Sequence, residues 1–271
     1  MIKNKRGIII LVISLIIVYV AISIISIIPR GKKYSSTVFL DSLTKVTIKD
    51  GNIRVYNEDE KITKQNIKLY FKGSFKDCYI ISKEVPSTGV GNNYFAYNKN
   101  GENLIPESTL IAHTPDISIK VKEDTKREST DIDEISNFIE TSDIVISSNY
   151  DLDYLIVNTL DIDNDGKDEY IYSVGLIKYD DEEDAEENEE ETQEYISIVY
   201  LEKDGKYITI DKIESDGDPV SSIKLSFAKL IDFNNDDNYE FVIEEMMSEY
   251  GPYYYELYSF GSNKFTKIGG E

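Results

Sequence analysis

The chain lacks tryptophan and has one cysteine, Cys78, and one histidine, His113, among its 271 residues. A single cysteine excludes an intrachain disulfide, and one cysteine with one histidine cannot complete a zinc site or another soft-metal site. The neighbours of Cys78, Asp77 and Tyr79, include no cation that would favour a thiolate. We therefore expect Cys78 to be a buried small hydrophobic residue, and we expect no metal or catalytic role for His113.

Signatures of catalysis are also missing. The chain has no phosphate-binding glycine loop, no zinc signature and no recognisable nucleophile–base pair. Paired carboxylates could serve a glycan-active enzyme, which is one alternative interpretation. The acidic residues in question are better explained as metal ligands, so we expect a non-catalytic protein.

Basic residues are few relative to acidic ones: 29 Lys and Arg stand against 51 Asp and Glu, for a net charge of -22. A surface of this sign repels phosphate backbones, which argues against nucleic acid as a partner. Many of the acids lie in one run, residues 180–194. Such a run is typical of a solvated, self-repelling loop insertion and lacks the fixed geometry that selects a cation.

One long hydrophobic run is present, at residues 8–28, and it contains no charged residue. A helix of this length spans a hydrocarbon core of about 30 Å. No small-residue cleavage site follows the run, so an uncleaved anchor is favoured over a cleaved signal peptide. Cationic residues flank both ends, and the short tail 1–7 is expected in the cytoplasm with the acidic C-terminal domain outside.

The region after a polar linker, residues 29–37, reads as β-structure up to residue 130. Apolar and polar residues alternate at 44–49 and 53–56 around Lys-Asp-Gly-Asn, which predicts a hairpin. Further short strands are expected at 66–71, 77–81, 94–97, 108–113 and 117–121. Residues 131–141 predict a soluble helix with one apolar face, formed by Ile132, Ile135, Phe138 and Ile139. With its connector this segment, 131–149, separates the first region from the second.

Residues 150–271 show the same order of elements twice. Strands are expected at 154–160, 169–178, 195–201 and 206–211, and again at 223–231, 239–246, 253–260 and 264–268. An acidic loop follows the first strand of each set, and the insertion 180–194 follows the second strand of the first set. Self-similarity of this kind indicates two repeats of a four-stranded antiparallel unit.

The loop 161–169 has the sequence D-I-D-N-D-G-K-D-E, with acids at positions 1, 3, 5 and 9 and Gly166 at position 6. Converging oxygen donors around a sharp glycine turn suit a hard cation such as calcium. A helical calcium hand needs an acid at position 12, where this chain has Tyr172, and the flanks read as strands. The helical hand is therefore excluded.

The segment D-I-D-N-D-G-K-D-E-Y-I resembles the calcium loop of FG-GAP/VCBS-type repeats, which form the blades of integrin-like β-propellers. The resemblance covers residues 150–271 only. It implies that calcium is held by four side chains and one main-chain carbonyl, supplied by Asp161, Asp163, Asp165, Glu169 and the carbonyl of Lys167. It also implies that Asp168 faces solvent.

The second loop, 232–240, departs from this pattern. Asn234 replaces an acid, and Asp237 stands where glycine is expected, so a left-handed turn there costs roughly 1 kcal/mol. The resemblance implies a weaker site formed by Asp232, Asn234, Asp236, Glu240 and the carbonyl of Asn238. For both loops the alternative is an Asp- and Asn-rich turn whose side chains bond their own backbone.

Together these features predict an all-β extracytoplasmic region with one membrane helix and one short soluble helix. Two repeats cannot close a propeller, so an open sheet or sandwich is favoured over a propeller with degenerate blades from the first region. The expected function is a single-pass, cell-surface, calcium-binding module that binds another surface protein or a cell-wall polysaccharide. A membrane-bound accessory or sensor subunit is the alternative.

Overall fold

The computed structural model describes residues 34–40, 44–57, 62, 64–84, 92–104, 110–128, 150–178, 194–216, 224–246 and 253–269. Within them the chain is all-β, as expected, and every strand pairing is antiparallel. The expected membrane helix 8–28, soluble helix 131–141 and acidic insertion 180–194 lie outside the described residues. In the described part of the chain, no helix is long and apolar enough to cross a membrane.

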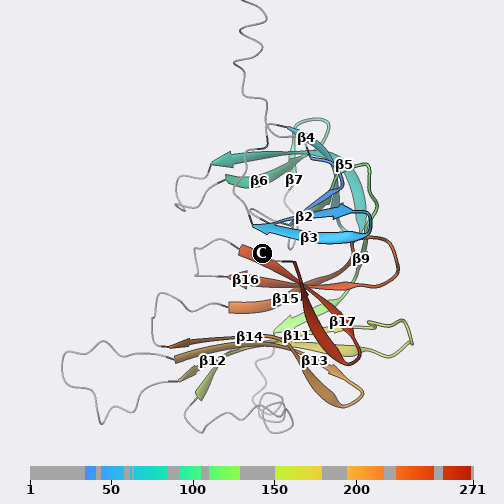
Figure 1. Ribbon diagram of the computed structural model, residues 1–271. Coiled ribbons are helices and arrows are strands. Elements are labelled where there is room, and N and C mark those ends of the chain that lie inside the picture. The colour runs from blue at the N-terminus through green and yellow to red at the C-terminus, as the bar shows by residue number, and fades with distance from the viewer. Residues whose placement is uncertain are drawn as a thin grey trace, which may run out of the picture.

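Three sheets are stacked as three layers, with the first sheet at the top of Figure 1. The first sheet has eight strands in the order β3-β2-β1-β8-β4-β5-β6-β7. Its strands are β1 (Thr37–Leu40), β2 (Thr44–Lys49), β3 (Asn52–Asn57), β4 (Gln65–Phe71), β5 (Ser74–Glu84), β6 (Asn92–Tyr97), β7 (Asn103–Leu104) and β8 (Ile111–His113). The expected hairpin is β2 and β3, with Ile48 opposite Ile53.

The other two sheets have five strands each and share one plan. The bottom layer has the order β10-β11-β12-β13-β14, and the middle layer has the order β9-β15-β16-β17-β18. The bottom strands are β10 (Thr125–Glu128), β11 (Tyr150–Leu160), β12 (Glu169–Lys178), β13 (Glu194–Lys203) and β14 (Lys206–Asp216). The middle strands are β9 (Lys120–Lys122), β15 (Lys224–Asp232), β16 (Glu240–Met246), β17 (Tyr253–Gly261) and β18 (Lys264–Ile268).

The two predicted four-stranded units are thus each completed by a fifth strand from the first region. β9 pairs with β15 and β10 pairs with β11, although the sequence assigned both to the region that ends at residue 130. Only two residues, Glu123 and Asp124, separate β9 from β10. The chain therefore crosses from the middle layer to the bottom layer at this point and links the two.

Apolar side chains fill both spaces between the layers. Phe233, Tyr255 and Leu257 of the middle layer pack against Val38, Leu40 and Val46 of the top layer. On its other side the middle layer presents another apolar set to the bottom layer, formed by Leu225, Phe227, Phe241 and Ile243 against Ile171, Val199 and Leu201. The middle sheet therefore has an apolar layer packed against each of its two faces.

β9 pairs with β15 only at residues 230–232, and the uncovered edge of β15 before them is capped by side chains of the bottom layer. Ser173 and Ser197, both fully buried, accept hydrogen bonds from the backbone N–H groups of Phe227 and Leu225 at 2.9 and 2.8 Å. The Tyr154 hydroxyl donates to the Leu225 carbonyl at 2.9 Å. Burial of an unpaired strand edge is costly, and these side chains remove that cost.

Candidate metal centre

The loop 161–169 joins β11 to β12 and is held by its own first carboxylate. Asp161 accepts backbone N–H bonds from Asp165 at 3.1 Å and from Gly166 at 3.0 Å, one on each carboxylate oxygen. Two residues have left-handed backbone, Asn164 with φ of 61° and Gly166 with φ of 85°. The sharp turn expected at Gly166 is therefore present, and Asn is one of the few other residues that adopt this conformation readily.

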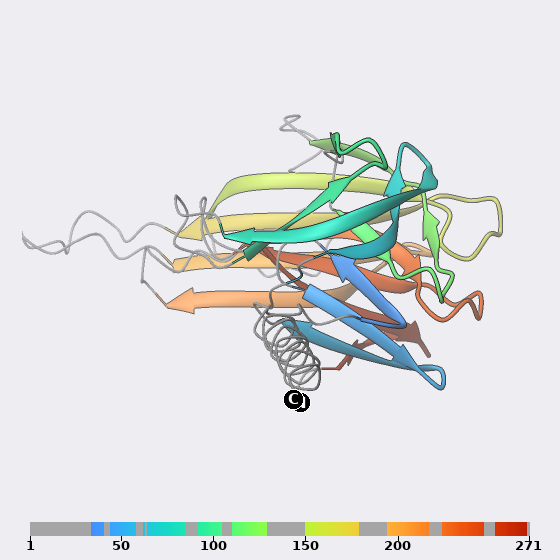
Figure 2. The same cartoon turned by 90° about the horizontal axis from the view of Figure 1, so that it is seen from above.

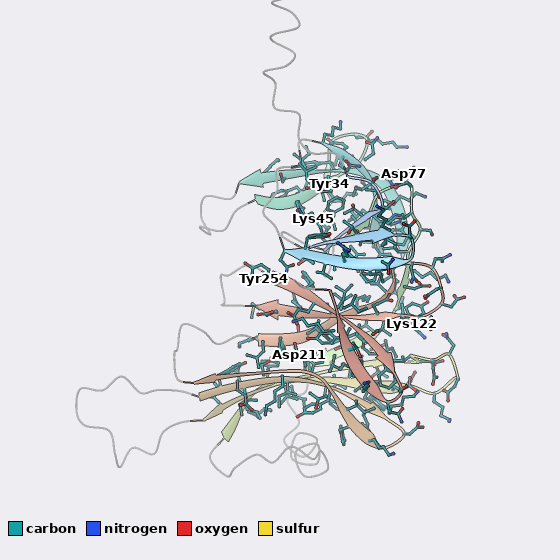
Figure 3. The ribbon with its side chains drawn as sticks, viewed as in Figure 1. Tyr34, Lys45, Asp77, Lys122, Asp211 and Tyr254 are labelled. Carbon is teal, nitrogen blue, oxygen red and sulfur yellow. The ribbon has the colours of Figure 1, made fainter. Side chains whose placement is uncertain are left out.

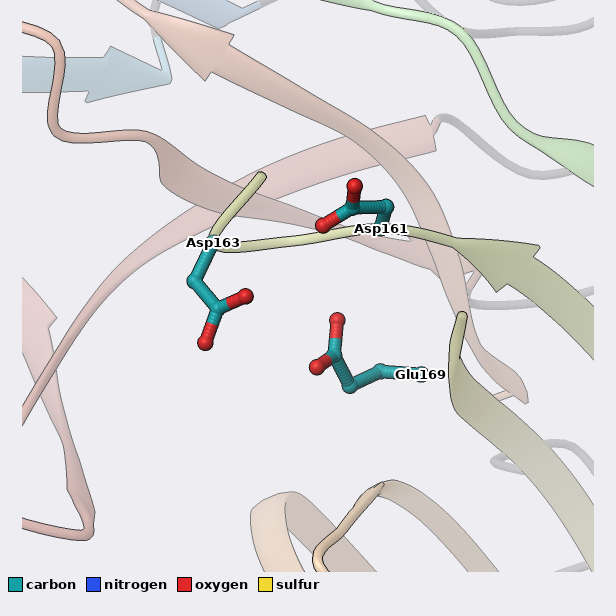
Figure 4. A group of neighbouring side chains, drawn as sticks. All are labelled: Asp161, Asp163 and Glu169. Carbon is teal, nitrogen blue, oxygen red and sulfur yellow. The ribbon is translucent and has the colours of Figure 1, made fainter. Parts of the chain in front are cut away.

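Three of the predicted ligands lie together. One carboxylate oxygen from each of Asp161, Asp163 and Glu169 lies within 4.8 Å of the corresponding oxygen of the other two. Figure 4 shows the three carboxylates turned toward a common space. Glu169 is 6% exposed and its Oε2 accepts the Ile162 N–H at 2.7 Å, which fixes it at the start of β12. Three carboxylate oxygens in this arrangement suit a hard cation.

The fourth predicted side chain, Asp165, is not one of these three. Its Oδ1 accepts the Lys167 N–H at 2.8 Å, and its Oδ2 lies 3.3 Å from the Lys167 ammonium. Asp168 is exposed, as expected. The hydrogen bonds from the backbone to the loop carboxylates that were predicted for a plain acidic turn are thus present in the same loop as the carboxylate cluster. A carboxylate can accept these bonds and also bind a cation, because an ionised carboxylate has about four lone-pair positions.

A lysine that sequence reasoning missed reaches into the cluster. The Lys203 ammonium, from the end of β13, lies 2.5 Å from Asp163 Oδ2 and 3.0 Å from Glu169 Oε1. The hydrogen bond from Lys203 lowers the pKa of Asp163, and the same bond raises the pKa of Lys203 despite partial burial. The cluster therefore contains an internal positive charge.

The second loop, 232–240, repeats the backbone of the first at the corresponding place between β15 and β16. Asp232 accepts N–H bonds from Asp236 and Asp237, both at 3.0 Å. Asn235 and Asp237 have φ of 61° and 67°, so the expected left-handed conformation of Asp237 is present. No group of three acidic side chains as close as that of the first loop occurs here among the described residues. Asn234 in place of an acid explains part of this difference.

The first aspartate of the second loop is more deeply buried than its counterpart Asp161, which is half-buried. Asp232 is fully buried and Glu240 is 7% exposed. Burial raises the pKa of Glu240 to about 7, with Asp236 and Asp232 as additional negative neighbours. The backbone N–H of Asn238 instead lowers the pKa of Asp236. A buried carboxylate with acidic neighbours is stabilised by any cation that enters the loop.

Two lysine side chains of the short strand β9 contact the two loops, one loop each. The Lys120 ammonium lies 3.3 Å from Asp232 Oδ2 and also contacts Asp237, whereas Lys122 donates to Asn164 Oδ1 at 2.8 Å and to the Ile162 carbonyl at 3.1 Å. Residues two apart on a strand share a face, so both lysines point toward the loops. Figure 3 shows Lys122 between the middle and bottom layers, and Figure 2 shows the loops after β11 and β15 at the same end of the molecule.

The sequence carried one signal for these lysines. Lys-Val-Lys at the end of the strand expected over 117–121 places two ammonium groups on one strand face. Nothing in the sequence indicated that Lys203 would meet Glu169 and Asp163, which lie 34 and 40 positions earlier in the chain.

Comparison of the chain with models of known protein families, with curated proteins and with solved structures finds no match.

Proposed function

We propose that the protein is a membrane-anchored, non-catalytic module that binds calcium through the loops 161–169 and 232–240 and presents its β layers outside the cell. The observation that carries the proposal is the equivalence of the two loops. Each follows the first long strand of a five-stranded sheet, and in each the first aspartate accepts two backbone N–H bonds. Both place oxygen-bearing side chains around a left-handed turn, as a hard cation requires.

The proposed ligands in the first loop are Asp161, Asp163, Asp165, Glu169 and the Lys167 carbonyl. Those in the second are Asp232, Asn234, Asp236, Glu240 and the Asn238 carbonyl. The first site is the stronger, because it has three clustered carboxylates and one more acid. Calcium would stiffen the junction of the middle and bottom layers, since an ion that binds only the folded chain adds its binding free energy to stability.

The proposed location follows from the uncharged run 8–28 and from the ion. Extracellular calcium fills sites with dissociation constants of about 10⁻⁴ to 10⁻³ M, whereas cytosolic calcium does not. In this proposal the partner is another surface protein or a cell-wall polysaccharide, bound by the stacked layers that calcium keeps rigid. Nucleic acid is an unsuitable partner, because the net negative charge of the chain repels a phosphate backbone.

Isothermal titration of the full chain in detergent micelles with calcium chloride tests the proposal. Two bound ions per chain are expected, with Asp161→Asn removing the tighter site and Asp232→Asn removing the weaker one. Asp168→Asn is the matched control, because Asp168 is exposed in the same loop and outside the proposed ligand set. Equal heats from the wild type and both ligand variants would show that the loops do not hold calcium.

A further inference from the structure

Each loop contains a lysine ammonium supplied by a different strand. Lys203, whose side chain is 20% exposed, spans Asp163 and Glu169 in the first loop. Lys120 contacts Asp232 and Asp237 in the second loop. The bonds to Asp163, Glu169 and Asp232 use carboxylates that belong to the proposed calcium ligands.

The two lysines do not occupy equivalent positions in the two sheets. Lys203 ends β13 and pairs with Lys206 across a two-residue turn, and the residue that ends β17 and pairs with Lys264 across the matching turn is Gly261. The second loop therefore has no side chain at that position and receives its ammonium from β9 instead. Each loop thus has an ammonium group beside its carboxylates, and the two ammonium groups come from strands that are not equivalent in the two sheets.

We infer that Lys203 and Lys120 are tethered counter-ions that hold the loops in shape without a metal, and that an incoming divalent cation must displace them. This inference rests on the proposed calcium function and specifies how it is regulated. The ammonium and the metal seek the same oxygens, and two positive charges a few ångströms apart repel one another. The lysines therefore set the calcium concentration at which the loops fill.

The test removes the ammonium and keeps the length of the side chain. Titration of the full-length Lys203→Met variant with calcium chloride is expected to show one site tightened by roughly tenfold or more relative to the wild type. Adding Asp161→Asn should abolish that gain, which assigns it to the first loop. Lys206→Met is the matched control, because Lys206 carries the same charge in the same hairpin, is exposed, and is not among the residues that contact Asp163 or Glu169 in an ion pair.

The second loop provides an independent arm should Lys203→Met fail to fold. Lys120→Met alters a side chain that is 39% exposed and is expected to tighten the other site. Gly261→Lys in that background then moves the ammonium to the position that Lys203 has in the first loop and should weaken the site again. A Cβ at Gly261 meets no atom within 4 Å, so the substitution fits.

Thermal unfolding without calcium gives a second readout: Lys203→Met should melt below Lys206→Met, because Asp163 and Glu169 lose their counter-ion. If the wild type binds calcium and neither Lys203→Met nor Lys120→Met binds it more tightly than Lys206→Met, the inference is wrong and the calcium function stands. If no form of the protein binds calcium, both are wrong.

Discussion

The serines that cap the part of β15 not paired with β9 give the most direct prediction about how the middle and bottom layers are joined. Ser173 is fully buried and its Oγ accepts the Phe227 N–H at 2.9 Å. The change Ser173→Ala removes the acceptor and leaves the N–H buried without a partner. An orphaned buried donor costs about 1–3 kcal/mol.

Differential scanning calorimetry of the full chain in detergent would measure this cost. For a protein of this size, 1 kcal/mol corresponds to a shift in melting temperature of roughly 2–4 °C, so a decrease of about 2–12 °C is expected. Ser259→Ala is the control, because Ser259 makes an exposed bond to the Thr266 carbonyl on β18 and should change stability by less than about 0.5 kcal/mol. Equal melting temperatures for the two variants would refute the reasoning that side chains of the bottom layer satisfy the edge of β15.

Three further predictions concern packing, pH and topology. Gly175→Ala should destabilise the protein by about 1–3 kcal/mol in chemical denaturation, because its Cβ would overlap the Tyr154 ring, whereas Gly261→Ala should not. His113 is 2% exposed and burial lowers its pKa, so below about pH 6.5 the unfolded chain binds a proton that the folded chain resists. The His113 contribution to stability therefore falls from pH 7 to pH 5, whereas protonation of Glu240, whose pKa is raised to about 7, acts in the opposite direction. Relative to pH 7, His113→Gln should therefore be more stable at pH 5 than the wild type, and the same pH dependence in both proteins would contradict this. Protease added outside intact cells should digest the β layers, and protection of those layers would contradict the proposed orientation.

Local sequence patterns predicted much of the strand content but not every strand. Alternation of apolar and polar residues located β2 and β3, and the bounds of β12 and β18 agree with those expected. β1 was missed and its first residue, Thr37, was assigned to the linker. All four residues of β1 are buried, so the strand shows no alternation. β10 was also missed, because Thr-Lys-Arg-Glu carries no apolar signal and is placed only by pairing with β11.

The backbone of the candidate site was more predictable than its electrostatics. A left-handed turn at Gly166 and at Asp237 follows from the local sequence, and both are present. The neighbouring charges are not local: Lys120 meets Asp237 across 117 positions of sequence. Such contacts depend on which strand lies beside the loop, and that in turn depends on the two extra strands, β9 and β10, which complete the sheets.

The measurement that tests the central claim most directly is the melting temperature of the full chain with and without added calcium. Calcium well above the dissociation constant should raise the melting temperature of the wild type, because the ion binds only the folded loops. The double variant Asp161→Ala plus Asp165→Ala should lose the part of the rise that comes from the first loop. A rise equal to that of the wild type, or no rise in either protein, would contradict the assignment of calcium to the loop 161–169.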